Sequence, residues 1–180
     1  MSCKRVAVFV SGEGTNLQAI IDASCHNLVP IDISLVVCNN PNANAINRAT
    51  NKNIPVFILE NGDLSREEYD RKVLLELQKN NIDLVVLAGW MRVLSNVLIN
   101  SYINKIINIH PALPGQYPGT NAIKRAYIDA QEGKIKVTGV MVHVVVEEVD
   151  AGEVIDFVQV PINPGDRYDM LEERIRGVEK

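Results

Sequence analysis

Short apolar runs rich in β-branched residues recur through the first half of the chain. They occupy residues 6–10, 33–37, 55–59 and 84–88, with Ser34 the one polar residue among them. Runs that are apolar at every position are typical of strands covered on both faces, whereas strands with one exposed face alternate apolar and polar residues. The first half of the sequence therefore predicts buried strands of a parallel sheet.

Two stretches between these runs repeat their apolar residues with the period of an α-helix. Residues 16–23 and residues 65–78 each carry apolar side chains along one helical face. Ser65 and Glu68 have the spacing of a capping box, in which each residue hydrogen-bonds the backbone of the other. Strands that alternate with helices in this way predict parallel strands joined by right-handed crossovers.

The second half of the chain opens with one more buried strand. Residues 106–109 are apolar apart from Asn108, and the run ends at the His110-Pro111 step. A loop rich in proline and glycine follows, and then residues 121–131 have the pattern of a helix.

The last third of the chain has longer apolar runs. Residues 137–146 and 153–160 are joined by a short polar segment, which favours an antiparallel pair of strands. A final helix is predicted to begin near Asp166 and to be still running at Lys180. Because this helix has neither a cap nor a breaker in the sequence, we expect the C-terminus to be truncated.

The complete pattern predicts one α/β domain over residues 1–180. We expect a mostly parallel, twisted sheet flanked by helices, with an antiparallel strand pair near the C-terminus. A chain of 180 residues with 47% hydrophobic and 22% charged residues has enough apolar material for a core of this size.

Charge and cysteine content narrow the possible functions and location. The net charge of -4 argues against a nucleic-acid-binding surface, which needs a basic patch. The three cysteines, Cys3, Cys25 and Cys38, lack CxxC spacing, so the sequence does not indicate a disulfide framework or a zinc site. This cysteine content is typical of a protein in a reducing compartment. The sequence contains no apolar run of transmembrane length. We therefore expect a cytoplasmic protein without membrane or nucleic-acid partners.

A glycine loop, residues 11–16, lies between the first predicted strand and the first predicted helix. Glycines allow the backbone to approach a ligand closely, and the N–H groups at a helix N-terminus point toward an anion. Thr15 and Asn16 can add hydroxyl and amide donors. The loop matches neither a dinucleotide fingerprint nor a Walker A motif, so a single phosphate, as on ribose 5-phosphate, fits better. A tight turn capped by Thr15 or Asn16 is the alternative interpretation.

Candidate catalytic side chains are predicted at the end of the strand over residues 106–109. Asn108 and His110 project to the same face of the strand, and Pro111 ends it, so both lie at the carboxyl edge of the sheet. An Asn amide can stabilise an oxyanion, and a His can donate or relay a proton. Asp150 follows the next long run and could reach the same place, where a carboxylate favours the imidazolium form of a histidine.

Other interpretations of these residues stay open from spacing alone. An isolated Asn-x-His-Pro is more often a strand end with a satisfied histidine than a site. His143 interrupts an apolar strand, so a structural histidine hydrogen-bonded in the core is expected. A metal site could draw only on His110, His143, Asp150 and Glu147, without HxH or HxxxH spacing. Nucleophilic catalysis lacks an elbow motif such as G-x-S-x-G.

The sequence resembles the phosphoribosylglycinamide formyltransferases, a family of folate-dependent formyltransferases. The resemblance runs from the first strand to Lys180. It is carried by residues 11–18 (SGEGTNLQ), 87–92 (LAGWMR), 108–114 (NIHPALP) and 149–152 (VDAG). It implies a Rossmann-like formyltransferase fold and transfer of a formyl group from 10-formyltetrahydrofolate to the amine of glycinamide ribonucleotide (GAR) in purine synthesis.

The resemblance also implies roles for single residues. His110 would be the general acid, Asn108 would share in catalysis, and Asp150 would raise the pKa of His110 and order a water. The GAR-binding residues would be Gly14, Thr15, Asn16 and Glu179. The folate-binding residues would be Arg66, Met91, Arg92, Val93, Leu94, Asn108, Glu147, Glu148, Val149 and Asp150. The N-terminal half would thus bind phosphate, and the C-terminal half would hold the catalytic and folate residues, without a metal.

The chain departs from the family at one loop. Many members have Ser-Leu-Leu-Pro after His-Pro, where this chain has residues 112–115, Ala-Leu-Pro-Gly. Methionyl-tRNA formyltransferase and formyltetrahydrofolate hydrolase resemble the same motifs, but each has an extra domain for which 180 residues leave no room. A non-catalytic nucleotide-binding module, using the glycine loop alone, is a rival of a different class.

Overall fold

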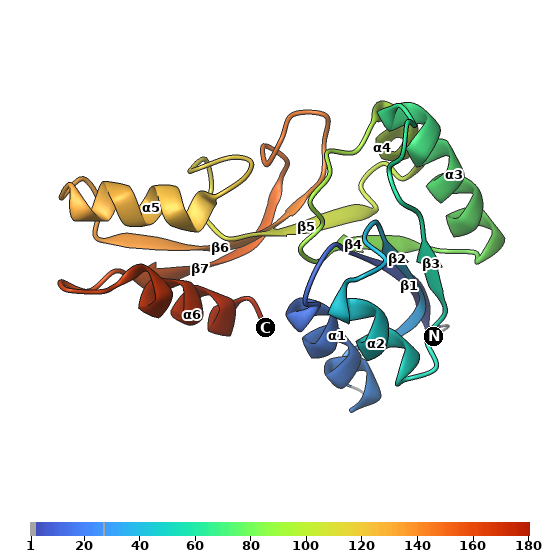
Figure 1. Cartoon of the computed structure of the whole chain (residues 1–180), viewed down its shortest axis with the longest axis horizontal. Coiled ribbons are helices and arrows are strands. Elements are labelled where there is room, and N and C mark those ends of the chain that lie inside the picture. The colour runs from blue at the N-terminus through green and yellow to red at the C-terminus, as the bar shows by residue number, and fades with distance from the viewer. Residues whose placement is uncertain (1–2, 27) are drawn as a thin grey trace. The chain divides into compact units, whose positions relative to one another are not determined.

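A computed structural model describes residues 3–26 and 28–180 (Figure 1). Its elements, in chain order, are β1 (Lys4–Val10), α1 (Thr15–Cys25), β2 (Ile31–Cys38), α2 (Asn44–Thr50), β3 (Val56–Ile58), α3 (Arg66–Lys79), β4 (Leu84–Leu87), α4 (Asn96–Ser101), β5 (Ile106–His110), α5 (Ala122–Gln131), β6 (Val137–Val144), β7 (Val154–Pro161) and α6 (Tyr168–Val178). The chain divides into two compact units, Met1–Ile107 and Asn108–Lys180.

The strands are hydrogen-bonded in the order β3-β2-β1-β4-β5-β6-β7. β1 pairs in parallel with β2 and with β4, and β2 pairs in parallel with β3. β6 and β7 are antiparallel, with Val140 opposite Val158. The predicted fold class, a mostly parallel sheet flanked by helices with an antiparallel C-terminal pair, is confirmed.

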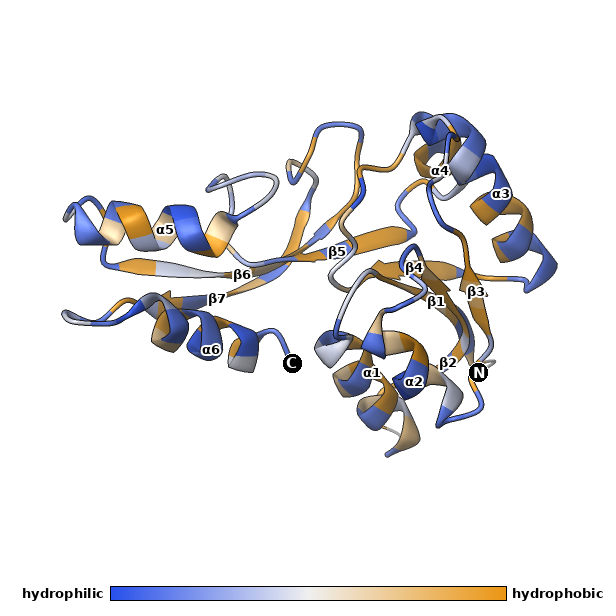
Figure 2. Cartoon of the chain, viewed as in Figure 1, coloured by the Kyte–Doolittle hydropathy of each residue, from blue (hydrophilic) through white to orange (hydrophobic). Residues whose placement is uncertain are grey.

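The core of the first unit follows from the two-residue period of β1. Val6, Val8 and Val10 lie on one face of the strand, where they pack in one cluster with Leu17 of α1 and other residues of α1 and α2. Phe9 faces the other side, and its ring lies 5.1 Å from that of Trp90. Figure 2 shows β1 and β2 coloured as hydrophobic strands, as expected for strands covered on both faces.

Both predicted helices of the first half are confirmed as α1 and α3. The capping box at the start of α3 is complete, because Ser65 Oγ accepts from Glu68 N at 3.2 Å and the Glu68 carboxylate accepts from Ser65 N at 2.9 Å. Helices α2 and α4 were not predicted from the sequence. Each spans fewer than about two helical turns, which is too short to show an apolar periodicity.

In the second unit, α5 and α6 pack on the β6–β7 pair. The buried cluster contains Val140 and Val160 from the strands and Leu171 and Ile175 from α6. In the described part of the chain, no helix combines the length and the apolar character needed to cross a membrane.

The final helix begins near Asp166, as expected, but the expectation that it is still running at Lys180 is wrong. α6 begins at Tyr168 and ends at Val178, with Glu179 as its C-cap. Asp166 lies in the preceding turn, where its carboxylate accepts from Asn163 N at 2.8 Å and from Arg174 at 2.7 Å. These hydrogen bonds fix Asp166 outside the helix, since a side chain that bonds the backbone locally favours a turn.

Candidate active site

The second unit brings Asn108, His110 and Asp150 into direct contact, as the sequence predicted. Asn108 Nδ2 donates to Asp150 Oδ1 at 3.1 Å, and His110 Nδ1 lies 3.3 Å from Asp150 Oδ2. The side chains of His110 and Asp150 are only 5% and 9% exposed. Asn108 and His110 alternate with Ile109 on β5, so both side chains reach the same carboxylate.

The local backbone positions Asp150 at the centre of this group. Asp150 has a left-handed backbone with φ 54°, and its Oδ2 accepts from Gly119 N at 2.7 Å. Gly152 follows in the same loop, where an added Cβ would lie 1.8 Å from the carbonyl oxygen of Val144. Only glycine fits there, which gives the Asp-Ala-Gly segment a structural reason.

His143 is a fourth member of the group, which the sequence did not assign to it. As expected, this histidine is buried and hydrogen-bonded: its Nδ1 lies 2.9 Å from Val144 O. Its Nε2, however, lies 3.2 Å from Asn108 Nδ2 and 3.3 Å from Asp150 Oδ1. His143 therefore orients the predicted catalytic side chains rather than filling the core alone. The one signal in the sequence was a polar ring inside an apolar strand.

The surroundings of His110 act on its pKa in opposite directions. Burial lowers the pKa of His110, and although Asp150 and the Tyr117 carbonyl act in the opposite direction, the pKa stays below its usual value. Asp150 acts to raise the pKa of His110, as the resemblance implies, but desolvation of the ring outweighs the neighbouring carboxylate. His110 Nε2 lies 3.1 Å from Tyr117 O, so both ring nitrogens face acceptors.

Asp150 is held in its charged form. Burial acts to raise its pKa, but hydrogen bonds from His143 and from Gly119 N, with the nearby charge of His110, lower the pKa below its usual value. The centre of the site is therefore a buried carboxylate with a fixed set of donors.

The glycine loop lies in the first unit, at the start of α1. Gly14 is the N-cap of α1 with φ 69°, and an added Cβ would lie 2.6 Å from Ala45 Cβ. Residues of α2 hold the loop: Ala45 N donates to Gly12 O at 3.1 Å, and Arg48 Nε donates to Glu13 O at 2.7 Å. Sequence reasoning missed these contacts because α2 itself was not predicted. Helix α1 begins at Thr15, one residue earlier than expected, and its N-cap is Gly14 rather than Thr15 or Asn16.

A pocket of about 370 Å³ lies in the first unit near the start of α3. It is lined by Asn61, Leu64, Arg66, Met91, Arg92 and Val93. The structure thus brings together Arg66, Met91, Arg92 and Val93 of the predicted folate-binding residues. The fifth predicted residue of this unit, Leu94, is buried and does not line the pocket.

Arg92 is firmly held in the pocket wall. Its guanidinium carbon lies 3.9 Å from the centre of the Tyr69 ring, and Nη1 donates to Asn61 Oδ1. Arg66, the first residue of α3, is exposed. Asn61 and Leu64 were missed in the sequence because they lie in an irregular segment without a motif.

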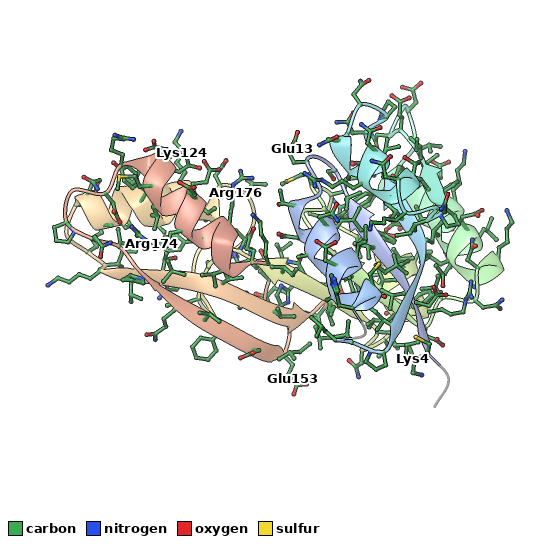
Figure 3. All side chains as sticks on the ribbon, turned by 90° about the horizontal axis from the view of Figure 1, so that it is seen from below. Lys4, Glu13, Lys124, Glu153, Arg174 and Arg176 are labelled. Atoms are coloured by element: carbon green, nitrogen blue, oxygen red, sulfur yellow. The ribbon has the colours of Figure 1, made fainter. Side chains whose placement is uncertain are left out.

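The remaining predicted residues lie in the second unit. Glu147, Glu148 and Val149 are exposed in the connection between β6 and β7. Glu179, at the end of α6, lies close enough to Arg176 to contribute to that residue's raised pKa, after the larger effect of the Glu172 hydrogen bond. Figure 3 shows Arg174 and Arg176 extending from α6.

Within residues 3–26 and 28–180, no group of three or more His, Cys, Asp or Glu side chains is arranged to hold a metal ion. The second unit offers polarised N–H donors beside a buried carboxylate, an arrangement suited to proton transfer and to stabilising a developing oxyanion.

A family model described as formyl transferase matches residues 4–180. Phosphoribosylglycinamide formyltransferase of Dictyostelium discoideum is 43% identical, over 94% of this chain and 89% of that protein. Glycinamide ribonucleotide transformylase 1 of Geobacillus kaustophilus has a crystal structure that aligns with a TM-score of 0.93 at 43% identity, over 98% of this chain and 93% of that one. The trifunctional purine biosynthetic protein adenosine-3 of Drosophila melanogaster is 42% identical over 98% of this chain, which spans 13% of its length.

Proposed function

This chain belongs to the formyl transferase family, among the phosphoribosylglycinamide formyltransferases. We therefore propose that it transfers a formyl group to the amine of GAR in purine biosynthesis. The group of Asn108, His110 and Asp150 carries the proposal. A buried carboxylate that contacts both an amide and an imidazole is typical of a catalytic site and is not required in a non-catalytic binding module.

The proposed formyl donor is 10-formyltetrahydrofolate. The pocket beside α3 supports this assignment, because Leu64, Met91 and Val93 offer apolar contacts and Arg66 offers an exposed cation for the donor's carboxylates. We assign Arg92 to the pocket wall, since Tyr69 and Asn61 hold its guanidinium. Glu147, Glu148 and Val149 remain predicted folate contacts.

For GAR, we propose that Gly14, Thr15 and Asn16 bind the phosphate and that Glu179 binds the glycinamide end. The backbone of Gly14 supports the first part: its left-handed φ and its close packing on Ala45 fix the tight turn into α1, and the N-terminus of a helix favours an anion.

The proposed reaction is direct transfer. The GAR amine attacks the formyl carbon, so that a new C–N bond forms and the carbonyl oxygen becomes an oxyanion. Asn108 and His110 donate hydrogen bonds to that oxygen. The intermediate collapses with cleavage of the bond to folate N10, and the proton lost by the amine passes, through a water held by Asp150, to N10. Asn108 Nδ2 now faces His143 Nε2 and Asp150, so binding of the formyl oxygen replaces one of these contacts.

Incubation with 10-formyltetrahydrofolate, with and without GAR, tests the function. GAR-dependent release of tetrahydrofolate with formation of formyl-GAR is the expected result. Release without GAR would identify a hydrolase, and the absence of release would overturn the proposal in favour of a binding module. We expect Asn108→Ala, His110→Ala and Asp150→Ala each to lower kcat by roughly 100- to 1000-fold. The cytoplasmic location and the absence of nucleic-acid partners stay predictions.

A further inference from the structure

The loop between β5 and α5, residues 111–121, contacts both ionisable members of the proposed active site through its backbone. The Tyr117 carbonyl lies 3.1 Å from His110 Nε2, and Gly119 N donates to Asp150 Oδ2 at 2.7 Å. The orientation of His110 and Asp150 therefore depends on the conformation of this loop.

The loop does not have a conformation that its own sequence would maintain. Its left-handed residues are Gly115, Tyr117, Gly119 and Asn121, with φ between 48° and 80°. A left-handed backbone is unfavourable for Tyr117, because its Cβ crowds the following carbonyl. Such a conformation persists only where surrounding contacts determine it.

Those contacts come from α5, which begins where the loop ends (Figure 1). Arg125 Nη2 donates to Tyr117 O at 2.5 Å and to Pro118 O at 2.7 Å. Tyr117 OH donates to Asp129 Oδ2 at 2.8 Å, and the Arg125 guanidinium carbon lies 5.7 Å from the Tyr117 ring centre. Arg125 and Asp129 are four residues apart, so one face of α5 holds both the backbone and the side chain of Tyr117.

We propose that Arg125 is a positioning residue for the formyl transfer: by holding the Tyr117 and Pro118 carbonyls, it fixes the loop that orients His110 and Asp150. The catalytic part of this inference rests on the proposed function, whereas its structural part does not. Arg125 acts on the reacting groups only through the loop, since its partners are carbonyl oxygens.

Arg125→Met removes the donors and keeps most of the aliphatic stem. We expect kcat to fall roughly 10- to 100-fold, the range for losing hydrogen bonds made by a charged group, while KM for both substrates stays within about twofold. Arg125→Lys keeps one cationic donor and is expected to recover part of kcat. Lys124→Met, at the exposed neighbouring position on α5 (Figure 3), is the matched control and is expected to behave as wild type.

Two readouts do not depend on turnover. Burial and His143 lower the pKa of His110, whereas Asp150 and the Tyr117 carbonyl raise it. In Arg125→Met we expect the NMR titration of His110 to shift from its wild-type position and the Gly119 amide to exchange faster with solvent. Tyr117→Phe, which removes only the contact with Asp129, is expected to give smaller changes and serves if Arg125→Met does not fold.

The inference is overturned if Arg125→Met folds and keeps the wild-type kcat, or if His110 titration and Gly119 exchange are both unchanged. A wild-type protein without formyl transfer would contradict the proposed function alone. In that case the His110 titration and the Gly119 exchange still decide whether Arg125 positions the two residues.

Discussion

Two opposing effects act on the pKa of the His110 imidazole. The carboxylate of Asp150 and the carbonyl of Tyr117 both favour a protonated ring, and the removal of solvent disfavours it. The lowered pKa shows that desolvation is the larger effect. A lowered pKa favours the neutral ring at neutral pH, and its one N–H can donate a hydrogen bond to an oxyanion.

We expect Asp150→Asn to lower the pKa of His110 further. The substitution removes the charge that favours the imidazolium form and leaves the ring buried, so only the effects that lower the pKa gain weight. Imidazole NMR titration measures the shift, with His110→Gln to assign the resonance. Glu153→Gln changes an exposed carboxylate nearby in sequence and is the control. An unchanged or higher pKa in Asp150→Asn would contradict the balance described for His110.

His143 is expected to matter for turnover without touching substrate. Its Nε2 contacts Asn108 Nδ2 and Asp150 Oδ1, and its Nδ1 contacts Val144 O. We expect His143→Leu to lower kcat by roughly 5- to 100-fold, since one buried unmade hydrogen bond costs about 1–3 kcal/mol. KM for both substrates should change little, and His143→Gln should recover part of the loss.

The exposed residue His26 provides the control for this experiment as His26→Leu, which we expect to leave kcat unchanged. Steady-state kinetics with GAR and the formyl folate measure all three variants. A His143→Leu enzyme with wild-type kcat would show that Asn108 and Asp150 hold their positions without this histidine.

Among the elements, β1 has a special place because it pairs with β2 on one side and with β4 on the other. The loops that follow β1 and β4 therefore leave the same carboxyl edge of the sheet side by side, at the type of position where open α/β sheets bind ligands. One hydrogen bond joins them: Met91 N donates to Ser11 Oγ at 2.9 Å. Ser11 starts the glycine loop, and Met91 lines the pocket proposed for folate.

We expect Ser11→Ala to weaken binding of a folate analogue roughly 3- to 10-fold, because the loss of one hydrogen bond, about 1 kcal/mol, lets the Met91 segment move. Any effect of bound GAR on folate affinity should decrease as well, since the link between the two loops is lost. Calorimetric titration with and without GAR measures both. Ser24→Ala, which removes a similar hydrogen bond to Ile31 O, is the control. Equal folate affinities in Ser11→Ala and wild type would disprove the link.

Across the whole molecule, apolar patterning was sufficient for the strands and the longer helices, because a core on both faces of a sheet leaves a clear trace in sequence. It was insufficient for α2, and with it for the contact between Arg48 and Glu13, because a helix of seven residues has too few turns to show a period. The meeting of Asn108 with Asp150 followed from strand ends, whereas the part of His143 depends on the register between neighbouring strands, which no local pattern encodes.

The lowered pKa of His110 also has a consequence for the stability of the molecule. The unfolded chain binds a proton near pH 6.5, while the folded chain resists it, so the free energy of unfolding should fall as the pH decreases from 6.5 through the lowered pKa. The slope from this one group is at most about 1.4 kcal/mol per pH unit. Stability from the lowered pKa of Asp150 is lost only at more acidic pH, below its usual value of 3.8.

Urea unfolding at pH values from about 7.5 to about 5.0 measures this dependence of the unfolding free energy on pH. The range extends about 1 unit or more to either side of the ordinary histidine pKa. His110→Gln cannot take up the proton, so we expect its unfolding free energy to change less over this range than that of the wild type. His26→Gln, which removes an exposed histidine, is the matched control. If His110→Gln and wild type lose stability in parallel, the buried imidazole is not the group that resists protonation, and the neutral donor assigned to His110 would have to be abandoned.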